Sequence, residues 1–377
     1  MTIVAAESRV LEVLLMTNQH SHVVQITEQS FGQLSSGETA SLFTLTNQQG
    51  MQVKISNYGG IIVSIFTHDK THRLSDIVLG YDCVADYEVD SYYLGAIIGR
   101  YAGRIEKGQF NLDGELYQLA LNAPDSQLHG GKTALNKQLW QATTEQAENS
   151  ATLILTYLSP DGEEGFPGEV NFTVKYQLTN ENELVVEYFA KTNKTTIINL
   201  TQHSYFNLSG HNSGNIHQHK ININAENFLP MSERAYPTGE IKSVKNTAHD
   251  FTFLRCLADD INNTNDAQIN IGLGYDNYWL LNDKALATDE YAAQAIEESS
   301  GRRLTIYTDQ PSMILYTANY IDGSHYGKNN FQYQKRAAFC LEPQRANNKI
   351  KGVNIDNCKL TPDQPFYSQT RYVFDVI

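Results

Sequence analysis

Residues 170–190 alternate between apolar and polar side chains, and this pattern constrains the fold more than any other stretch of the chain. The apolar members are Val170, Phe172, Val174, Tyr176 and Leu178, followed after a turn at 179–183 by Leu184, Val186 and Tyr188. Because successive side chains of a strand point to opposite faces, the pattern predicts two strands with one buried and one solvated face. Such strands are typical of an antiparallel sheet.

Short alternating segments bounded by turn residues recur along the rest of the chain. We expect strands at 41–46, 52–56, 61–66, 76–81, 220–224, 277–281, 303–308, 313–318, 337–341 and 370–376. A hairpin is expected over 108–119, with Asp113-Gly114 as its two-residue turn. Only 84–88 and 288–295 have a helical pattern. The sequence therefore predicts an all-β protein, one large antiparallel β-sandwich over residues 26–377, preceded at 1–25 by an extension of unassigned function.

The composition narrows the range of possible ligands and functions. The 22 tyrosines and 15 phenylalanines favour strands and also suit carbohydrate, whose C–H faces pack on aromatic rings. A net charge of −14 disfavours nucleic acid and anionic membranes, and no apolar run approaches the roughly 20 residues of a membrane span. The N-terminal 16 residues lack the clean apolar core of a signal peptide.

The four cysteines, at 83, 256, 340 and 358, have no CxxC spacing. They indicate reduced thiols in a cytoplasmic protein rather than a disulfide framework or a zinc site. His217 and His219 form an HxH pair without a supporting third ligand, so we expect a solvated loop there.

Two residues stand out as candidates for acid–base chemistry. His203 follows an apolar run in the segment 199–210, and imidazole is suited to proton transfer near neutral pH. Glu342 lies in an otherwise apolar strand that we expect to end at Pro343. A carboxylate desolvated there would have a raised pKa and greater strength as a base. A structural histidine and a surface-facing glutamate are the alternatives.

Three further segments carry candidate ligand-binding residues. Gly99-Arg-Tyr-Ala-Gly-Arg-Ile105 offers two arginines, whose donors suit sugar hydroxyls, or which pair with local acids. His129 precedes two glycines that leave room for a ligand. Asp276 begins an expected strand, where it either binds a ligand or forms a turn.

Taken together, these motifs resemble those of the galactose mutarotase (aldose 1-epimerase) family, from about Phe31 to the C-terminus. The matching segments are Asn57-Tyr-Gly-Gly60, Asp76-Ile-Val-Leu-Gly-Tyr-Asp82, Gly99-Arg-Tyr-Ala-Gly-Arg-Ile105, Leu128-His-Gly-Gly131, Gln202-His-Ser-Tyr-Phe-Asn-Leu208, Pro237-Thr-Gly-Glu240, Tyr275-Asp276 and Cys340-Leu-Glu-Pro-Gln344. The resemblance implies the large β-sandwich of that family, a supersandwich. It also implies interconversion of the α and β anomers of free aldohexoses such as galactose and glucose, without cofactor or metal.

The same resemblance assigns roles to six residues. It implies Glu342 as general base and His203 as general acid, with His129, Arg104, Tyr205 and Asp276 around the sugar. Two departures stand out. Gly103 replaces the asparagine that the family commonly has before the arginine, which leaves one sugar contact missing or taken by water. Residues 134–137, Ala-Leu-Asn-Lys, replace the family's usual Gly-Phe-Asp/Asn-Lys and put the loop shape in doubt.

Three other functions stay open on the sequence alone. A hexose-6-phosphate 1-epimerase would call for a basic cluster, which is not obvious here. A non-catalytic carbohydrate-binding module would need no embedded acid–base pair. A glycoside hydrolase would need a second carboxylate as strongly marked as Glu342. We expect a small-molecule aldose as the binding partner, and a monomer or homodimer.

Overall fold

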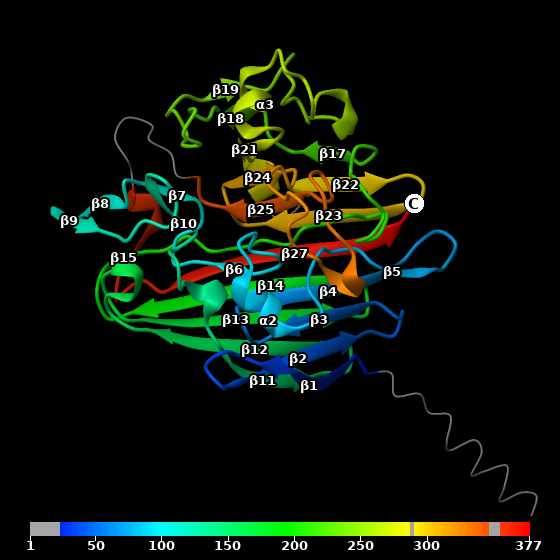
Figure 1. Ribbon diagram of the computed structural model, residues 1–377, viewed down its shortest axis with the longest axis horizontal. Coiled ribbons are helices and arrows are strands. Elements are labelled where there is room, and N and C mark those ends of the chain that lie inside the picture. Colours follow the sequence, from blue (N-terminus) through cyan, green and yellow to red (C-terminus); the bar gives the residue numbers. More distant parts are fainter. Residues whose placement is uncertain (1–22, 287–289, 347–354) are drawn as a thin grey trace, which may run out of the picture.

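Antiparallel strands are the main secondary structure of the protein in its computed structural model, which describes residues 23–286, 290–346 and 355–377 (Figure 1). The first sheet has the order β1 (Gln25–Gln33), β2 (Thr39–Thr46), β3 (Gln52–Ser56), β4 (Ile61–His68), β5 (Leu74–Asp76). A nine-stranded sheet has the order β11 (Gln141–Gln146), β12 (Ser150–Ser159), β13 (Val170–Thr179), β14 (Glu183–Thr192), β27 (Phe366–Val376), β23 (Arg302–Thr308), β22 (Ala293–Glu297), β17 (Lys220–Ile223), β20 (Arg255–Cys256). The predicted all-β, antiparallel fold class is confirmed.

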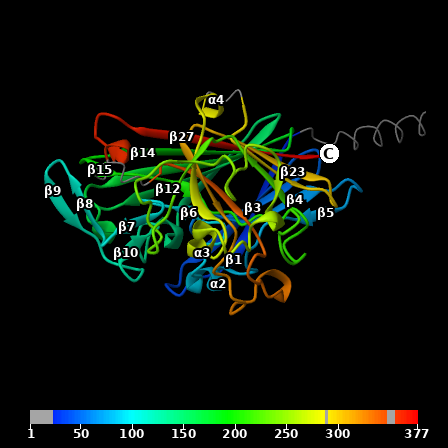
Figure 2. The same ribbon diagram turned by 90° about the horizontal axis from the view of Figure 1, so that it is seen from above.

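A third sheet lies in the upper part of Figure 1, partly at the height of β17, β22 and β23. Its order is β19 (Lys242–Ser243), β18 (Asn227–Leu229), β21 (Asp276–Leu280), β24 (Ser312–Tyr316), β25 (Cys340–Gln344). Four small antiparallel pairs complete the described strands: β6 (Ile97–Ile98) with β16 (Thr201–Gln202), β7 (Arg104–Glu106) with β10 (Ser126–Leu128), β8 (Gln109–Leu112) with β9 (Glu115–Gln118), and β15 (Thr196–Ile197) with β26 (Lys359–Leu360). The β8–β9 hairpin and β5 lie at opposite ends of the long axis (Figures 1 and 2).

Helices are short in the described residues. The α-helices are α2 (Val84–Val89), α3 (Ala267–Gly272) and α4 (Asp283–Leu286), and the 3₁₀ turns are η1 (Leu135–Lys137), η2 (Glu163–Gly165), η3 (Leu257–Asp259), η4 (Lys328–Asn330) and η5 (Ile355–Cys358). Among these residues, no helix has the length and apolar character needed to cross a bilayer.

The main core lies between the first sheet and the nine-stranded sheet. The alternating residues of β13 and β14 are its centre: Val174, Tyr176 and Val186 are fully buried, in one cluster with Val53 and Ile65. Burying such a side chain contributes about 1.5–3 kcal/mol. The Tyr176 hydroxyl donates 2.6 Å to the carbonyl oxygen of Gly60, which joins the two sheets where the chain turns toward β4. The hairpin predicted from 170–190 therefore anchors the fold.

Several predicted boundaries are wrong. Residues 293–297 form β22 and not the end of a helix, because Ala293 and Ala295 are fully buried between β17 and β23 and tertiary packing overrides their helical preference. The strand expected over 76–81 ends at Asp76. The expected extension at 1–25 falls mostly outside the described residues, and Gln25 already belongs to β1.

The prediction that Pro343 ends its strand is also wrong. The strand β25 begins only at Cys340 and continues to Gln344, with Pro343 opposite Met313. Since β25 is the last strand of its sheet, a residue without an N–H can be accommodated there without losing a ladder hydrogen bond. Glu342 therefore lies in the middle of a strand, whose backbone holds it rigidly.

Candidate active site

The third sheet supplies the floor of a cavity. Neighbouring positions on β21, β24 and β25 form two rows, Asp276–Tyr316–Cys340 and Tyr278–Ile314–Glu342. Because alternate residues share a face, all six lie on the same side of the sheet. Five of them, all except Cys340, line a cavity of about 140 Å³. That volume suits roughly ten water molecules, or one sugar ring in their place.

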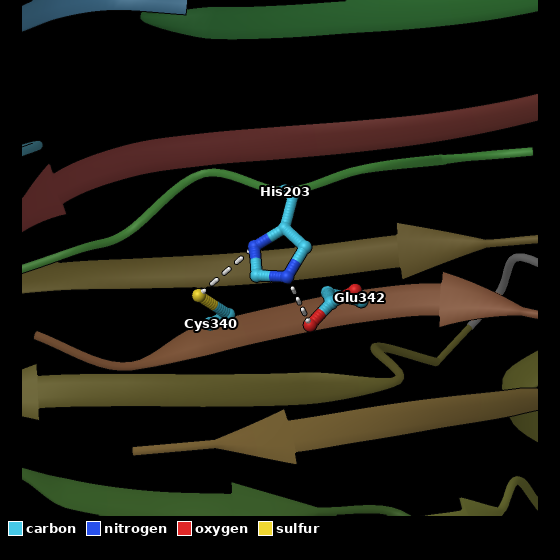
Figure 3. A group of neighbouring side chains, drawn as sticks. All are labelled: His203, Cys340 and Glu342. Atoms are coloured by element: carbon cyan, nitrogen blue, oxygen red, sulfur yellow. Dashed lines mark hydrogen bonds and ion pairs between the residues drawn. The ribbon is translucent and has the colours of Figure 1, made fainter. Parts of the chain in front are cut away.

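His203 meets Glu342 at this cavity. Its backbone is held by two hydrogen bonds to the residues just before β6, from His203 N to Ala96 O and from Gly95 N to His203 O, each 3.0 Å. The Nε2 atom of His203 lies 3.6 Å from Oε1 of Glu342 (Figure 3). The two side chains are only 6% and 2% exposed, and Oε2 of Glu342 has no hydrogen-bond partner among the described residues. A buried carboxylate with a vacant lone pair is therefore aimed at the site.

Burial dominates the proton affinities of this pair. It raises the pKa of Glu342 well above the usual carboxyl range, and the nearby Asp276 carboxylate adds to the rise. The Gln344 amide on the same face opposes the rise only weakly, and its atoms have no partner within hydrogen-bonding geometry. Burial lowers the pKa of His203 to about 4. Burial therefore favours the uncharged form of each group, a carboxylic acid beside a neutral imidazole.

Cys340 lies on the other side of the same imidazole. Its Sγ atom is 3.5 Å from Nδ1 of His203, and the three groups could hold an ion, since their ligand atoms all lie within 4.8 Å. An imidazole binds an ion through one nitrogen, however, and Figure 3 shows Cys340 and Glu342 facing different nitrogens. The arrangement fits a row of proton donors and acceptors better than a metal site.

The short pair β7–β10 brings Arg104 and His129 together. Leu128 stands opposite Arg104, and the next residue, His129, donates its backbone N–H 2.9 Å to the carbonyl oxygen of Gly103. In return the N–H of Gly103 donates 3.3 Å to Nδ1 of His129. A Cβ atom on Gly130 would lie 2.1 Å from Gly99 O, so glycine is required for this close approach.

The hydrogen bond to Nδ1 determines which proton His129 presents. Burial, together with the nearby His203 and Arg104, lowers the pKa of His129 well below its ordinary value, so the ring is neutral. A neutral ring that accepts at Nδ1 carries its proton on Nε2. Since His129 lines the cavity, it offers the site an N–H donor.

Asp276 and Tyr205 also line the cavity. Burial raises the pKa of Asp276 to about 6, an effect that the charge of Arg104 opposes. Tyr205 stacks on His203 with ring centres 5.0 Å apart, and its hydroxyl donates 2.7 Å to the carbonyl oxygen of Tyr92. Tyr205 therefore supports the imidazole with its ring, while its hydroxyl proton is already used by the backbone.

All six residues named from the sequence thus line one cavity: Arg104, His129, His203, Tyr205, Asp276 and Glu342. Five aromatic residues of the lining were missed: Tyr92, Tyr93, Tyr278, Tyr316 and Tyr320. Tyr278 could have been found, because it lies two residues after Asp276 in a predicted strand and so shares its face. Tyr93 comes from a loop and carried no signal.

Lys137 attaches the loop at residues 134–137 to the end of α2. Its ammonium group donates to the carbonyl oxygens of Tyr87, Glu88 and Asp90, at the C-terminal end of α2. The Asp90 carboxylate in turn accepts from the backbone N–H groups of Tyr92 and Leu94. Through Lys137, this loop therefore holds the segment from which Tyr92 and Tyr93 reach the cavity.

Two other candidates lie outside the cavity. Arg100 is buried, and it donates to Ser159 Oγ and to the carbonyl oxygens of Ser159, Pro160, Pro167 and Gly168. It is a structural arginine that ties loops together. The expectation of a solvated His217/His219 loop is wrong for His219, which is buried and accepts 2.9 Å from the N–H of Leu208.

The chain is similar to several known proteins. The model of the family described as aldose 1-epimerase matches residues 41–373. The galactose mutarotase of Sus scrofa is 39% identical over 94% of this chain and all of that protein, and the aldose 1-epimerase of Escherichia coli (strain K12) is 31% identical over 90% and 96%. The crystal structure of a galactose 1-epimerase from Lactobacillus acidophilus superposes with a TM-score of 0.83 at 26% identity, covering 94% of this chain and 99% of that one.

Proposed function

The chain belongs to the aldose 1-epimerase family, and from that premise we propose that Glu342 and His203 are the acid–base pair that opens and recloses the sugar ring. The protein is an isomerase that interconverts the α and β anomers of aldoses. The observation that carries the assignment is the pair itself: a buried carboxylate with a vacant oxygen, 3.6 Å from a buried imidazole, at one cavity.

The reaction needs two proton transfers. Ring opening removes the proton of the C1 hydroxyl, whose electron pair forms the C1=O bond while the bond from C1 to the ring oxygen breaks and that oxygen takes a proton. In our proposal Glu342 accepts the first proton and protonated His203 gives the second. The open aldehyde then turns about C1–C2 and closes on its other face with both transfers reversed. A positioned acid or base typically contributes about 10²–10⁴-fold.

The proton balance of the pair fits this cycle. A charged pair, Glu342 carboxylate with His203 imidazolium, is required when the cyclic sugar is bound. After ring opening the same proton count gives a carboxylic acid and a neutral imidazole, which is the arrangement that burial favours. The pair therefore stabilises the open-chain state, and no net charge enters or leaves the site.

The remaining groups would hold the sugar. His129 would donate from Nε2 near the reacting oxygens, and the Arg104 side chain and the Asp276 carboxylate would bind other hydroxyls. Tyr205 would hold the His203 ring in place. Arg104 is the only lysine or arginine among the described residues of the lining, and its charge acts on the Asp276 carboxylate. The cavity therefore suits an uncharged aldose such as galactose or glucose better than a sugar phosphate.

The domain bounds, the binding partner and the compartment are also part of this proposal. We place one mutarotase-like domain at 26–377, with 1–25 as an extension, and a small-molecule aldose as its partner. Four cysteines without a disulfide in the described fold suit a reducing cytoplasm.

The test is Glu342→Gln, which keeps the shape of the side chain but can neither accept nor release the proton. We expect the rate of anomer interconversion, followed by polarimetry on α-galactose, to fall about 10²–10⁴-fold while galactose binding persists. Glu145→Gln, an exposed position on β11, is the matched control and should keep full activity. Near-normal mutarotation by Glu342→Gln would refute the assignment.

A further inference from the structure

Gly103 and Tyr278 share one volume beside the cavity. Gly103 has φ +90°, and a Cβ atom built on it would lie 2.6 Å from the hydroxyl oxygen of Tyr278. Apart from its chain neighbours, the one other atom of the described residues within 4 Å is Oε1 of Gln344, at 3.9 Å. The hydroxyl of Tyr278 therefore occupies the space where any side chain at position 103 would begin.

Tyr278 stands between two groups of the proposed sugar site. It lies two residues after Asp276 on the same face of β21, and in the same row as Glu342, with Ile314 between them. Its side chain is only 3% exposed and lines the cavity. Burial raises the pKa of Tyr278 above its ordinary value, and the charges of Glu342 and then Asp276 add to the rise. The phenol thus belongs to the electrostatic surroundings of both carboxyl groups.

The hydroxyl of Tyr278 has no hydrogen bond to any residue in the described part of the chain, unlike the hydroxyl of Tyr205 on the same lining. Its oxygen is not among the fully buried polar atoms that lack a partner, so it is reached from the cavity, where a bound molecule can pair with it. Phenylalanine would serve as well if the ring were needed only for packing. The hydroxyl is therefore placed for a ligand.

We infer that Tyr278 is a substrate contact, whose hydroxyl hydrogen-bonds one hydroxyl of the bound aldose in the space that Gly103 leaves open. This deepens the proposed function and rests on it. It also accounts for glycine at position 103: the polar contact expected there is supplied from β21 instead, by a longer side chain that reaches the same volume.

The first test is Tyr278→Phe, compared with Tyr367→Phe, a surface position on β27. Loss of one neutral hydrogen bond to the substrate should raise KM about two- to tenfold and leave kcat within about twofold, because the contact acts on ground and transition states alike. Tyr367→Phe should match the wild type. Among monodeoxy galactoses, the sugar that lacks the partner hydroxyl should give the same KM with Tyr278→Phe and with the wild type.

The second test is a double-mutant cycle with Gly103→Ala. In the wild-type background the new methyl group meets the Tyr278 hydroxyl at 2.6 Å, whereas in Tyr278→Phe its nearest neighbour is Gln344 Oε1 at 3.9 Å. The strain of alanine at positive φ is common to both backgrounds and cancels. We expect Gly103→Ala to lower kcat/KM at least about fivefold more in the wild-type background than in Tyr278→Phe.

The outcomes separate the two proposals. If Tyr278→Phe has the wild-type KM for every sugar, or if the effects of Gly103→Ala and Tyr278→Phe multiply, the substrate contact in a shared volume is wrong while the acid–base pair stands. If Glu342→Gln is fully active, the proposed function fails, whatever Tyr278 does. Thermal unfolding of each variant checks that the fold is intact.

Discussion

The Sγ atom of Cys340 lies 3.5 Å from Nδ1 of His203, on the opposite side of the ring from Glu342 (Figure 3). Burial, with the nearby Glu342 carboxylate adding to it, raises the pKa of this thiol well above its ordinary value, so it stays protonated. An S–H group that donates to Nδ1 leaves the ring proton on Nε2, which faces Glu342. The thiol thus positions the proton that the proposed cycle uses.

Cys340→Ala should lower kcat by about two- to tenfold, the value of one weak hydrogen bond. Cys340→Ser keeps a donor at the same place and should restore most of the rate, although both substitutions remove the sulfur from a packed site. Polarimetric rates at saturating galactose measure the difference. Equal kcat values for the alanine and serine variants would remove the positioning role from Cys340.

His203→Asn should reduce the rate of anomer interconversion by about 10²–10⁴-fold, because asparagine cannot exchange a proton near neutral pH. The parallel variant His129→Asn should lose less, since a side-chain amide still offers an N–H donor. Initial rates with both anomers of galactose provide the comparison. A larger loss in His129→Asn than in His203→Asn would transfer the acid role to His129.

The pH profile should report Asp276 separately from the pair. The pKa of Asp276 is raised to about 6, and a carboxylic acid accepts fewer hydrogen bonds from sugar hydroxyls than a carboxylate, so kcat/KM should begin to fall as the pH drops through about 6. Asp276→Asn should abolish this limb and raise KM at every pH. A limb near 6 that persists in Asp276→Asn would assign it to another group.

The Glu342–His203 pair should produce two further limbs of the pH–rate profile, one at lower and one at higher pH. Below the pKa of His203, about 4, both groups are protonated and no base is left, so the rate falls with falling pH. Above the raised pKa of Glu342 the pair has lost its single proton, so the rate falls again on the alkaline side. These limbs belong to the coupled pair. In Asp276→Asn, where the limb near 6 is gone, an acid limb at the ordinary histidine value would contradict the burial of His203.

A buried ion pair should govern stability away from the site. The Lys328 ammonium donates to Asp76 Oδ2 at 2.5 Å and to the carbonyl oxygens of Val63 and Val78. Lys328→Met leaves Asp76 unpaired and should cost about 3–5 kcal/mol in the free energy of unfolding. Arg303→Met, from a half-exposed pair with Asp375, should cost about 0–1 kcal/mol. Urea unfolding measures both, and equal costs would contradict the reasoning.

The sequence predicted those parts of the site that depend on local pattern. Alternation over 170–190 located the central hairpin, and the motifs around His203 and Glu342 named side chains that the fold brings to one cavity. What it missed depends on contacts between distant segments. The contact between Gly103 and the Tyr278 hydroxyl joins residues 175 positions apart, and no local pattern reports it. Pro343 was misread because only the sheet order shows that β25 is an edge strand.

The β7–β10 pair has a consequence for how this protein can be altered. Three residue pairs between β7 and β10 fix the relative positions of Arg104 and His129. The chain between the two residues projects from the rest of the molecule as the β8–β9 hairpin (Figure 1). At its tip, no described residue other than the chain neighbours of Gly114 comes within 4 Å of a Cβ atom built on that glycine. Because the β7–β10 pairing aligns the two ends of this segment, we expect residues inserted after Asp113, whose carboxylate pairs with Lys359, to leave Arg104 and His129 in place. That turn is a permissive position for a fluorescent label or a surface tether, with the reacting end of the cavity left undisturbed.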